Sequence, residues 1–597
     1  MVYRVRHFSL PLGFDAPWYV WRADFVASQG MGPIETAARP GHALLSANLQ
    51  SLTGLSALQL DVVLPFVLVG VFALALGVLF AEGLGRGETS GWAIGAAVAA
   101  GLIGTTRLVG ENVANLLNIL LVVVGFLFLL RFITRRRGFV GAVAMLVAAG
   151  LAHWVFLGVF ALVLGVWFVL ALPVSRVRVG TVWETEAGAL AAAGAIVGAV
   201  MAILIYPVLH SSVRTFDLHE PKHRYIEKFR EDLGALRTAF TGPFAALGVG
   251  AMAVDRGGAL RSGFLRMIGA WTIVTGGGTI VAAATKAIQP HRFLTLLVVG
   301  PVVCAIAAAI AFAAGWLRRR VGSAVAVACG LLSVAAAVIP GAVTWYGDSP
   351  PKQFWDATAF QQARVAGEYV RRLPAGKPVV FVVNPLGPFG PVSTAEKERT
   401  IRAAMPPDRQ EDVHVYPGSI ERYAAGHPTH VPNEEIDVQN DAYWRDVKPV
   451  LRRHPAVLVL SAFAPRGPGL ANLIAPGVAV FRGPAHIPVP LLRPVHPVPT
   501  TEVALGRAIM LLILLAVAGL GWTAWFLGRA RSPLQLFALS PAIGSGVLIL
   551  ASLVTAKSGF ALGGVAGKAT WAVVALCGAV IVFASDRRQR GEELADR

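Results

Sequence analysis

A short acidic and aromatic segment near the start of the chain has the residue types of a reactive site. It reads GFDAPWYVWRAD and surrounds one carboxylate, Asp15, with rings. Its Trp and Tyr residues are Trp18, Tyr19 and Trp21, and its other charged residues are Arg22 and Asp24. Trp and Tyr collect at membrane interfaces, which accounts for the rings but not for the acid. A carboxyl group beside apolar rings is costly to ionise, and a raised pKa suits a general base. We therefore expect Asp15 to act chemically, with Asp24 as a second acid or a solvated charge.

Two further clusters could serve the same chemistry. In TTRLVGENVANLLN, Arg107 and Glu111 lie one helical turn apart, either as an ion pair at a helix end or as groups facing an outward cavity. In the second reading Glu111 is a second acid or a metal ligand. His153, in GLAHWVF, lies at another predicted outer turn, where a hydrogen-bonded interface histidine is the simpler interpretation.

The segment KAIQPHRFL gathers three hydrogen-bond donors at the start of an apolar run, namely Lys286, His291 and Arg292. Proline ahead of a span is an ordinary helix-start signal. Three donors at a helix N-terminus also form a ready phosphate site. The charged loop at 216–232 is predicted to be a solvated helix.

These groups must be positioned by membrane helices. Of the 597 residues, 55% are hydrophobic and 14% are charged, against about a quarter charged in soluble domains. Apolar runs of about 20 residues recur, and together with three shorter runs (92–103, 139–152 and 244–254) they predict a polytopic α-helical membrane protein of about thirteen spans. The clear runs are 60–80, 115–131, 154–173, 187–209, 264–285, 293–317, 322–346, 503–528, 534–556 and 562–585.

The charge pattern predicts the orientation of these spans. The net charge of +18 comes largely from arginine clusters that occupy every second gap between apolar runs. This is the pattern of cytoplasmic loops, so a nucleic-acid partner is not expected. Residues 1–59, the loop near 209–243 and the stretch 347–501 are then outside, and the tail 586–597 is cytoplasmic. The three cysteines lie in apolar runs and are expected to be small fillers: Cys304, Cys329 and Cys577.

The stretch 347–501 differs from the rest of the chain because no run in it could span a membrane. Short β-branched runs alternate with amphipathic helical stretches, which predicts a small extracytoplasmic α/β domain inserted between transmembrane helices. The expected organisation is a first loop (1–59), a transmembrane bundle (60–346), this domain (347–501) and C-terminal spans (502–585).

The first loop also predicts a helix. In ARPGHALLSANLQSLTG (residues 38–54), four leucines share one face and polar residues lie off it. Either this helix lies on the outer leaflet as an interfacial shelf, or it packs on the bundle as an ordinary loop helix. The loop is predicted to be outside and no span precedes it, so either the first span is an N-out anchor or a first transmembrane helix lies upstream of Met1. We expect the second.

The layout resembles the GT-C superfamily of integral-membrane glycosyltransferases. Those enzymes place an Asp-containing motif in the first outside loop, and FDAPWYVWRA is similar to the DPW-aromatic-x-x-R segment of oligosaccharyltransferase catalytic subunits. The resemblance covers one short motif and the overall topology. It implies a transferase that takes a sugar from a polyprenyl-phosphate donor and passes it to an acceptor outside the cytoplasm.

By this resemblance, Asp15 is the catalytic Asp of the first loop. It would act as general base or hold a divalent metal such as Mg²⁺ or Mn²⁺, and Glu111 would be the acidic residue of the second loop. Arg292, with His291, resembles the arginine that contacts the lipid phosphate, and Lys286 and Arg107 extend this cationic clamp. Contacts with the sugar or acceptor are expected from Trp18, Tyr19, Arg22, Asp24, Arg39 and His42.

The sequence departs from the family pattern at two motifs, and these departures bear on the expected metal dependence and acceptor. The second loop reads GEN rather than Asp-x-Asp, which puts metal dependence in doubt, and no WWDYG is present, which argues against protein N-glycosylation. No Walker-type, HExxH or CxxC motif is present either. We predict a plasma-membrane glycosyltransferase whose acceptor is an extracytoplasmic glycan, lipid or protein. The alternatives are a transporter or flippase of envelope precursors and a non-catalytic envelope assembly protein.

Overall fold

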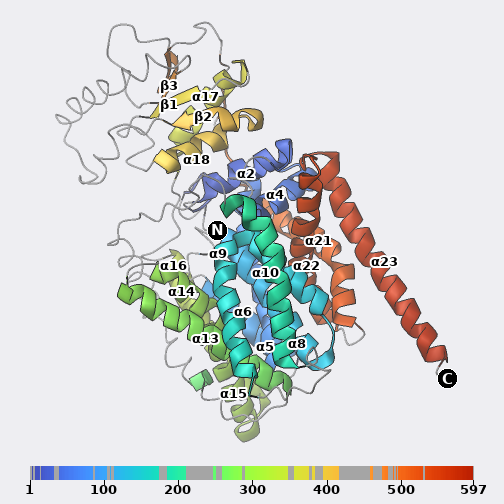
Figure 1. The fold of residues 1–597 in the computed structure, drawn as a ribbon. Coiled ribbons are helices and arrows are strands. Elements are labelled where there is room, and N and C mark those ends of the chain that lie inside the picture. Colours follow the sequence, from blue (N-terminus) through green and yellow to red (C-terminus); the bar gives the residue numbers. More distant parts are fainter. Residues whose placement is uncertain are drawn as a thin grey trace.

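The computed structural model shows a bundle of long apolar helices with a small sheet at one end (Figure 1). The described residues are 3, 7–13, 15–31, 39–84, 88–103, 108, 113–173, 185–209, 247–249, 259–285, 289–346, 355–374, 379–383, 394–415, 457–460, 473–481, 489, 492–493, 495–528 and 532–595.

Within these residues, nine helical segments are long and apolar enough to cross a membrane, so the chain is a multi-pass membrane protein. They are α5 (Ala57–Leu84), α8 (Val113–Arg135), α9 (Phe139–Ala171), α10 (Glu186–Leu209), α13 (Ala259–Thr285), the continuous segment α14 (Pro290–Leu297), η2 (Val298–Val302) and α15 (Val303–Arg320), then α21 (Thr501–Leu527), α22 (Pro533–Lys557) and α23 (Val565–Ala595).

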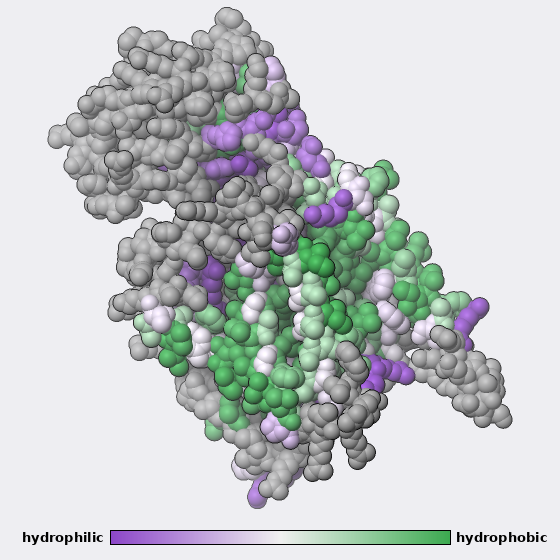
Figure 2. Space-filling model, in the orientation of Figure 1, coloured by the Kyte–Doolittle hydropathy of each residue, from purple (hydrophilic) through white to green (hydrophobic). Residues whose placement is uncertain are grey.

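The nine spans are fewer than the expected thirteen because some predicted runs form shorter helices, two are joined, and one lies mostly outside the described residues. Two shorter apolar helices, α6 (Glu88–Ile103) and α16 (Ser323–Tyr346), cover two of the predicted runs. The runs 139–152 and 154–173 are joined in α9, and most of the run 244–254 lies outside the described residues. Figure 2 shows the result: hydrophobic residues cover the visible face of the bundle, and hydrophilic residues gather toward its two ends.

The centre of the bundle is α8. Every residue of this helix from Val113 to Arg131 is buried. The ring of Phe126 meets three neighbouring aromatic rings edge-on at centroid distances of 5.9 to 6.0 Å, those of Phe160, Trp167 and Trp271. Edge-to-face contacts of this kind are favourable beyond the area they bury. Helices α9 and α13 are thereby fixed against α8.

Helix α9 folds back on itself at His153, whose backbone leaves the helical region at φ −161° and ψ 91°. Its first half runs beside α8, where Gly141 faces Phe128. Its second half returns along the same helix, where Phe160 contacts Phe126. Asn118 of α8 donates hydrogen bonds to the carbonyls of Ala149 and His153 at 2.7 and 3.2 Å, and so satisfies backbone groups freed at the break.

Two short helices connect the bundle to the sheet-bearing part of the chain, α2 (Ala16–Gln29) and α4 (Pro40–Thr53), and Figure 1 shows them between α18 (Thr394–Ala404) and the bundle. For residues 38–54, the structure favours the second interpretation, a helix packed on the bundle. Eleven of the 14 residues of α4 are buried, and the polar Asn48 donates hydrogen bonds to Ser552 Oγ at 3.3 Å and to the Gly567 carbonyl at 3.1 Å. Both faces of α4 are therefore packed, which was the alternative interpretation.

Among the residues that the structure describes, the sheet has five strands in the order β2-β1-β3-β5-β4. Strands β1 (Val379–Val383), β2 (Val413–Val415) and β3 (Val457–Leu460) are parallel, while β5 (Val478–Phe481) pairs antiparallel with β3 and with β4 (Leu473–Ala475). The other described elements of this part are α17 (Ala357–Arg371), α18 and the 3₁₀ turn η3 (Pro407–Asp412). Trp355, just before α17, donates a hydrogen bond to the Pro11 carbonyl at 2.8 Å, which joins the sheet-bearing part to the N-terminal segment.

Candidate active site

Asp15 lies at the N-terminal end of α2, where the helix begins because Pro17 follows in its first turn. Its side chain makes no capping hydrogen bond to the helix. Instead Oδ1 accepts a hydrogen bond from Nη1 of Arg399 at 2.9 Å, and the two side chains are 19% and 30% exposed. Arg399 comes from α18, so the sheet-bearing part of the chain supplies the cation for the first-loop carboxylate.

The ring of Trp18, one turn after Asp15, makes cation–π contacts with three guanidinium groups. Arg22 lies 4.1 Å from the ring centroid, Arg39 5.7 Å and Arg399 6.0 Å. Each cation over an indole is worth about 0.5–1 kcal/mol where exposed and more where buried. Arg39 is the residue before α4 and is half-buried. Burial lowers the pKa of its guanidinium, Asp15 and Tyr19 oppose this change, and Arg399 adds to it.

Three buried side chains lie next to these cations, those of Tyr19, His42 and Asp61. The rings of Tyr19 and His42 are 4.7 Å apart, and Nε2 of His42 lies 3.6 Å from Oδ1 of Asp61. Burial lowers the pKa of His42 to about 3, assisted by the positive charge of Arg22, so this imidazole is neutral. Burial also raises the pKa of Tyr19 above its ordinary value, with Asp15 adding to the rise. Tyr19 and Arg22 are therefore supports of the site, because they are only 3% and 1% exposed.

His153, at the break in α9, lies at the same end of the bundle and interacts electrostatically with both Arg39 and Arg292. Nδ1 of His153 accepts a hydrogen bond from the backbone N–H of Phe156 at 3.2 Å. In a neutral ring this leaves the proton on Nε2, which makes His153 a donor on its other side. Arg292, half-buried in the first turn of α14, is oriented by its Nε hydrogen bond to Gln289 Oε1 at 2.7 Å. Its neighbour His291 is also half-buried.

The other predicted residues are not part of this cluster. Glu111, Arg107 and Lys286 lie outside the described residues. Asp24 lies two and a half turns from Asp15 and therefore on the opposite side of α2. Burial raises its pKa to about 7, while nearby Gln50 and the backbone amide of Ala57 oppose the rise.

The described surroundings of Asp15 do not fit a divalent metal. Its carboxylate is engaged by a guanidinium, and the described part of the chain contains no group of three or more His, Cys, Asp or Glu side chains that could hold an ion. Metal sites of this kind are built from carboxylate and other oxygen ligands. Arginines dominate here, which is the composition of an anion site.

Sequence reasoning missed two members of the cluster. Arg399 is separated from Asp15 by 384 positions, and its segment STAEKERTIRAA has the charge pattern of an ordinary surface helix. Asp61 stands inside the apolar run LQLDVVLP. A lone acid in an apolar run is costly unless it serves a function, and this signal could have identified Asp61 as a site residue.

No family model matches the chain, and no curated protein sequence matches it. Among solved structures, the chain is similar to a cryo-EM structure of a mutant of the arabinofuranosyltransferase AftD from Mycobacteria, at 16% sequence identity and a TM-score of 0.44. The match covers 79% of this chain and 41% of that one, so the chain spans about two fifths of the length of AftD.

Proposed function

We propose that the chain is a GT-C-type membrane glycosyltransferase that transfers a sugar from a polyprenyl-phosphate donor to an acceptor hydroxyl. The observation that carries the proposal is the carboxylate of Asp15 set among Arg39 and Arg399 at the end of an apolar bundle. A base next to a cluster of cations is what the reaction needs. One group must accept the hydroxyl proton, and others must bind the phosphate that leaves.

In the proposed reaction, the acceptor oxygen forms a bond to the anomeric carbon, and the bond from that carbon to the phosphate oxygen breaks. The hydroxyl proton passes to Asp15. Oδ1 of Asp15 is held by Arg399, whereas Oδ2 accepts no hydrogen bond from a described residue. Oδ2 is therefore assigned to receive the proton, and Arg399 positions the carboxylate.

The lipid phosphate leaves with the electron pair of the broken bond. Arg39 and Arg292, with Nε2–H of His153, are assigned to stabilise its charge. From the sequence, Lys286 and Arg107 would extend this group and Glu111 would be the second acid. The acceptor is proposed to be a cell-envelope glycan, lipid or protein, and the reaction to take place on the extracytoplasmic side of the plasma membrane, with the C-terminus cytoplasmic.

Arg39 provides a test of the phosphate assignment. Arg39→Gln removes the charge and keeps a polar side chain, so it should lower kcat/KM for a polyprenyl-phosphate sugar by about 10- to 100-fold, the worth of one charge-assisted hydrogen bond in a desolvated site. Sugar release by the purified protein is measured with a panel of pentose and hexose donors. Arg364→Gln, in the sheet-bearing part, is the control and should leave kcat/KM unchanged. Equal kcat/KM for Arg39→Gln and the unmodified protein would contradict the phosphate assignment.

A further inference from the structure

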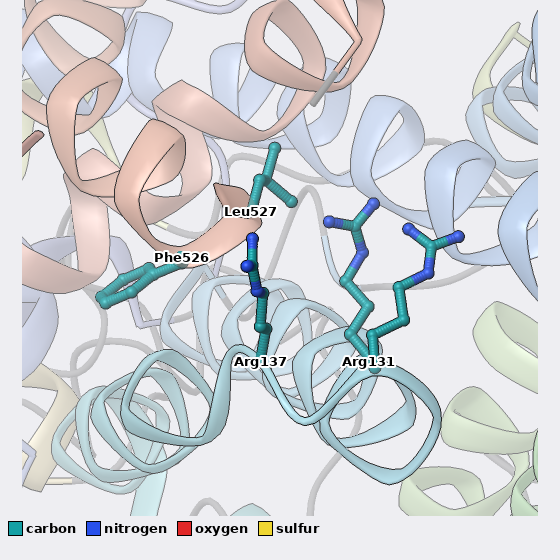
Figure 3. A pocket seen from close by; sticks show the side chains of 5 residues that line it. Arg131, Arg137, Phe526 and Leu527 are labelled. Carbon is teal, nitrogen blue, oxygen red and sulfur yellow. The ribbon is translucent and has the colours of Figure 1, made fainter. Parts of the chain in front are cut away.

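A second cationic feature lies at the end of the bundle away from the sheet. It is a cavity of about 200 Å³ lined by Arg131, Arg135, Arg137, Phe526 and Leu527 (Figure 3). Helix α8 extends from Ala114, which contacts Tyr19 of the candidate active site, to Arg135 beside this cavity. That distance is about 30 Å of helix. The cavity is therefore separate from the candidate active site and plays no part in the proposed reaction.

The cavity carries more positive than negative charge. Glu82 is shared by two of its arginines, lying 2.8 Å from Nη2 of Arg131 and 3.5 Å from Nη1 of Arg135. Arg137 forms no ion pair with a described residue, and Figure 3 shows its side chain extending toward Leu527. The cavity is thus lined by three guanidinium groups, and one carboxylate pairs with two of them. Guanidinium groups in excess around a cavity are suited to bind phosphate.

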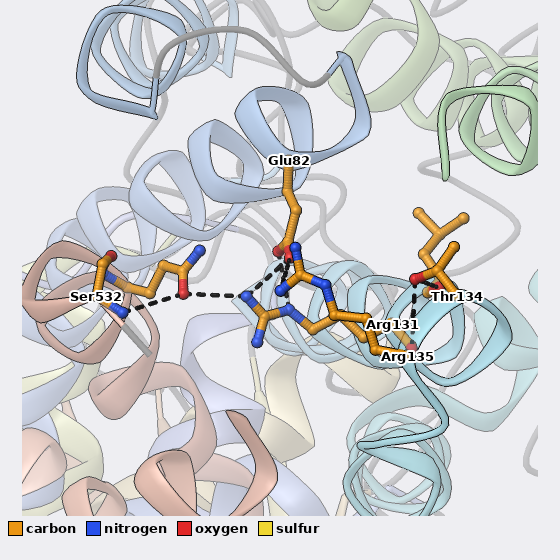
Figure 4. Close-up of polar contacts among 7 residues, drawn as sticks. Glu82, Arg131, Thr134, Arg135 and Ser532 are labelled. Carbon is orange, nitrogen blue, oxygen red and sulfur yellow. Dashed lines mark hydrogen bonds and ion pairs between the residues drawn. The ribbon is translucent and has the colours of Figure 1, made fainter. Parts of the chain in front are cut away.

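The guanidinium of Arg131 is held in place by neighbouring helices. Its Nε donates to Oε2 of Glu82 at 2.9 Å and its Nη2 donates to Oε1 of Gln535 at 3.0 Å. Glu82 belongs to α5 and Gln535 to α22, and Figure 4 shows Glu82 beside Arg131. Gln535 is itself fixed by a capping box with Ser532 at the start of α22. The preference for arginine in loops on one side of the membrane explains the presence of these cations. It does not require that one of them be buried and oriented at a cavity.

The wall of the cavity formed by α21 continues into a lipid-facing surface. Only 22% of the most apolar part of α21 is buried within the protein. Ile513, Val517 and Leu520 are exposed along this helix, and Leu520 lies two turns before Leu527 on the same side. An acyl chain beside α21 would place its headgroup at the level of the arginines. This arrangement favours a lipid phosphate over a phosphate ion from solution.

We propose that this cavity binds the phosphate group of an anionic phospholipid, with the acyl chains lying along α21. Arg135 and Arg137 are assigned to the phosphate, and Arg131 forms the fixed wall. The volume of about 200 Å³ exceeds several-fold the roughly 30 Å³ that one water occupies in the liquid, so there is room for a headgroup.

The test compares phosphatidylglycerol with phosphatidylcholine of the same acyl chains, added to the purified full chain in neutral detergent. Binding is measured by native mass spectrometry. The unmodified protein should bind phosphatidylglycerol more tightly. Arg135→Gln/Arg137→Gln should weaken that binding roughly fivefold for each arginine removed, as expected for basic groups near anionic lipid. The control is Arg318→Gln/Arg319→Gln, which removes two exposed arginines from the last turn of α15 and should leave binding unchanged.

Arg137→Gln alone repeats the test with a residue that is exposed and outside any ion pair with the described residues, so it is expected to fold normally. Equal phosphatidylglycerol affinity in the unmodified protein and in both variants would overturn the proposal, as would an equal loss in the control. A third arm adds inorganic phosphate at millimolar concentration. If phosphate alone displaced phosphatidylglycerol and raised the unfolding temperature as much as the lipid does, the site would be one for free phosphate and the lipid assignment would be wrong.

Discussion

Removing the carboxylate of Glu82 should be among the most destabilising single changes in the bundle. The side chains of Glu82 and Arg131 are only 7% and 3% exposed and meet in a two-point contact at 2.8 and 2.9 Å (Figure 4). Two charges about 4 Å apart attract by about 4 kcal/mol at an effective dielectric constant of 20. Glu82→Ala leaves the buried guanidinium with Gln535 as its remaining partner. We expect the free energy of unfolding to fall by about 3–5 kcal/mol.

A double-mutant cycle separates this interaction from simple loss of packing. Replacing both charges with apolar side chains, Glu82→Leu with Arg131→Met, leaves no uncompensated buried charge and should cost less than either single change. The assay is SDS-induced unfolding in mixed micelles. Glu368→Ala is the control, because its partners Arg371 and Arg372 are 61% and 37% exposed and such pairs contribute less than about 1 kcal/mol each. If the double variant lost the sum of the two single losses, the two residues would not be coupled and the reasoning would be refuted.

Two further predictions concern pH and metal ions. Burial raises the pKa of Asp24 from 3.8 to about 7, so the folded state favours the protonated carboxyl. The stability that Asp24 contributes is therefore fully present below pH 4. It is lost as the pH rises through 7. The full difference corresponds to about 4 kcal/mol, which we reduce to about 1–2 kcal/mol for a partly exposed group; Asp24→Asn should remove this loss in unfolding experiments between pH 4 and pH 8, and an unchanged pH profile would contradict it. Chelation with EDTA should leave sugar transfer unchanged, because arginines rather than carboxylates surround Asp15; activity lost with EDTA and restored by Mg²⁺ or Mn²⁺ would instead indicate that Asp15 and Glu111 hold a metal.

The sequence predicts the membrane helices well because each must be apolar over about 20 residues whatever it packs against. It predicts the helix at residues 40–53 but leaves open whether this helix lies on the membrane surface or packs on the bundle. Ser46, Asn48 and Gln50 have the composition of a solvent-facing side, whereas Asn48 makes its hydrogen bonds to α22 and to the start of α23. A polar residue satisfied by another helix cannot be distinguished from a hydrated one by periodicity alone.

The candidate site is only partly predictable for the same reason. Asp15 and its rings are adjacent in the chain and can be found by inspection. Arg399 meets Asp15 across 384 positions, and the fold of α9 at His153 depends on Asn118 satisfying the carbonyls that the break exposes. Contacts of this kind depend on tertiary packing, which local sequence patterns do not encode.

The most direct test of the account is sugar transfer by Asp15→Asn, compared with Asp24→Asn, the same substitution on the opposite side of the same helix. Transfer from a polyprenyl-phosphate sugar is measured with the purified proteins after confirming equal folding. The account predicts that Asp15→Asn lowers kcat by at least about 100-fold, as expected for loss of a general base, while Asp24→Asn retains the normal rate. Transfer by Asp15→Asn at the rate of the unmodified protein would contradict the central claim.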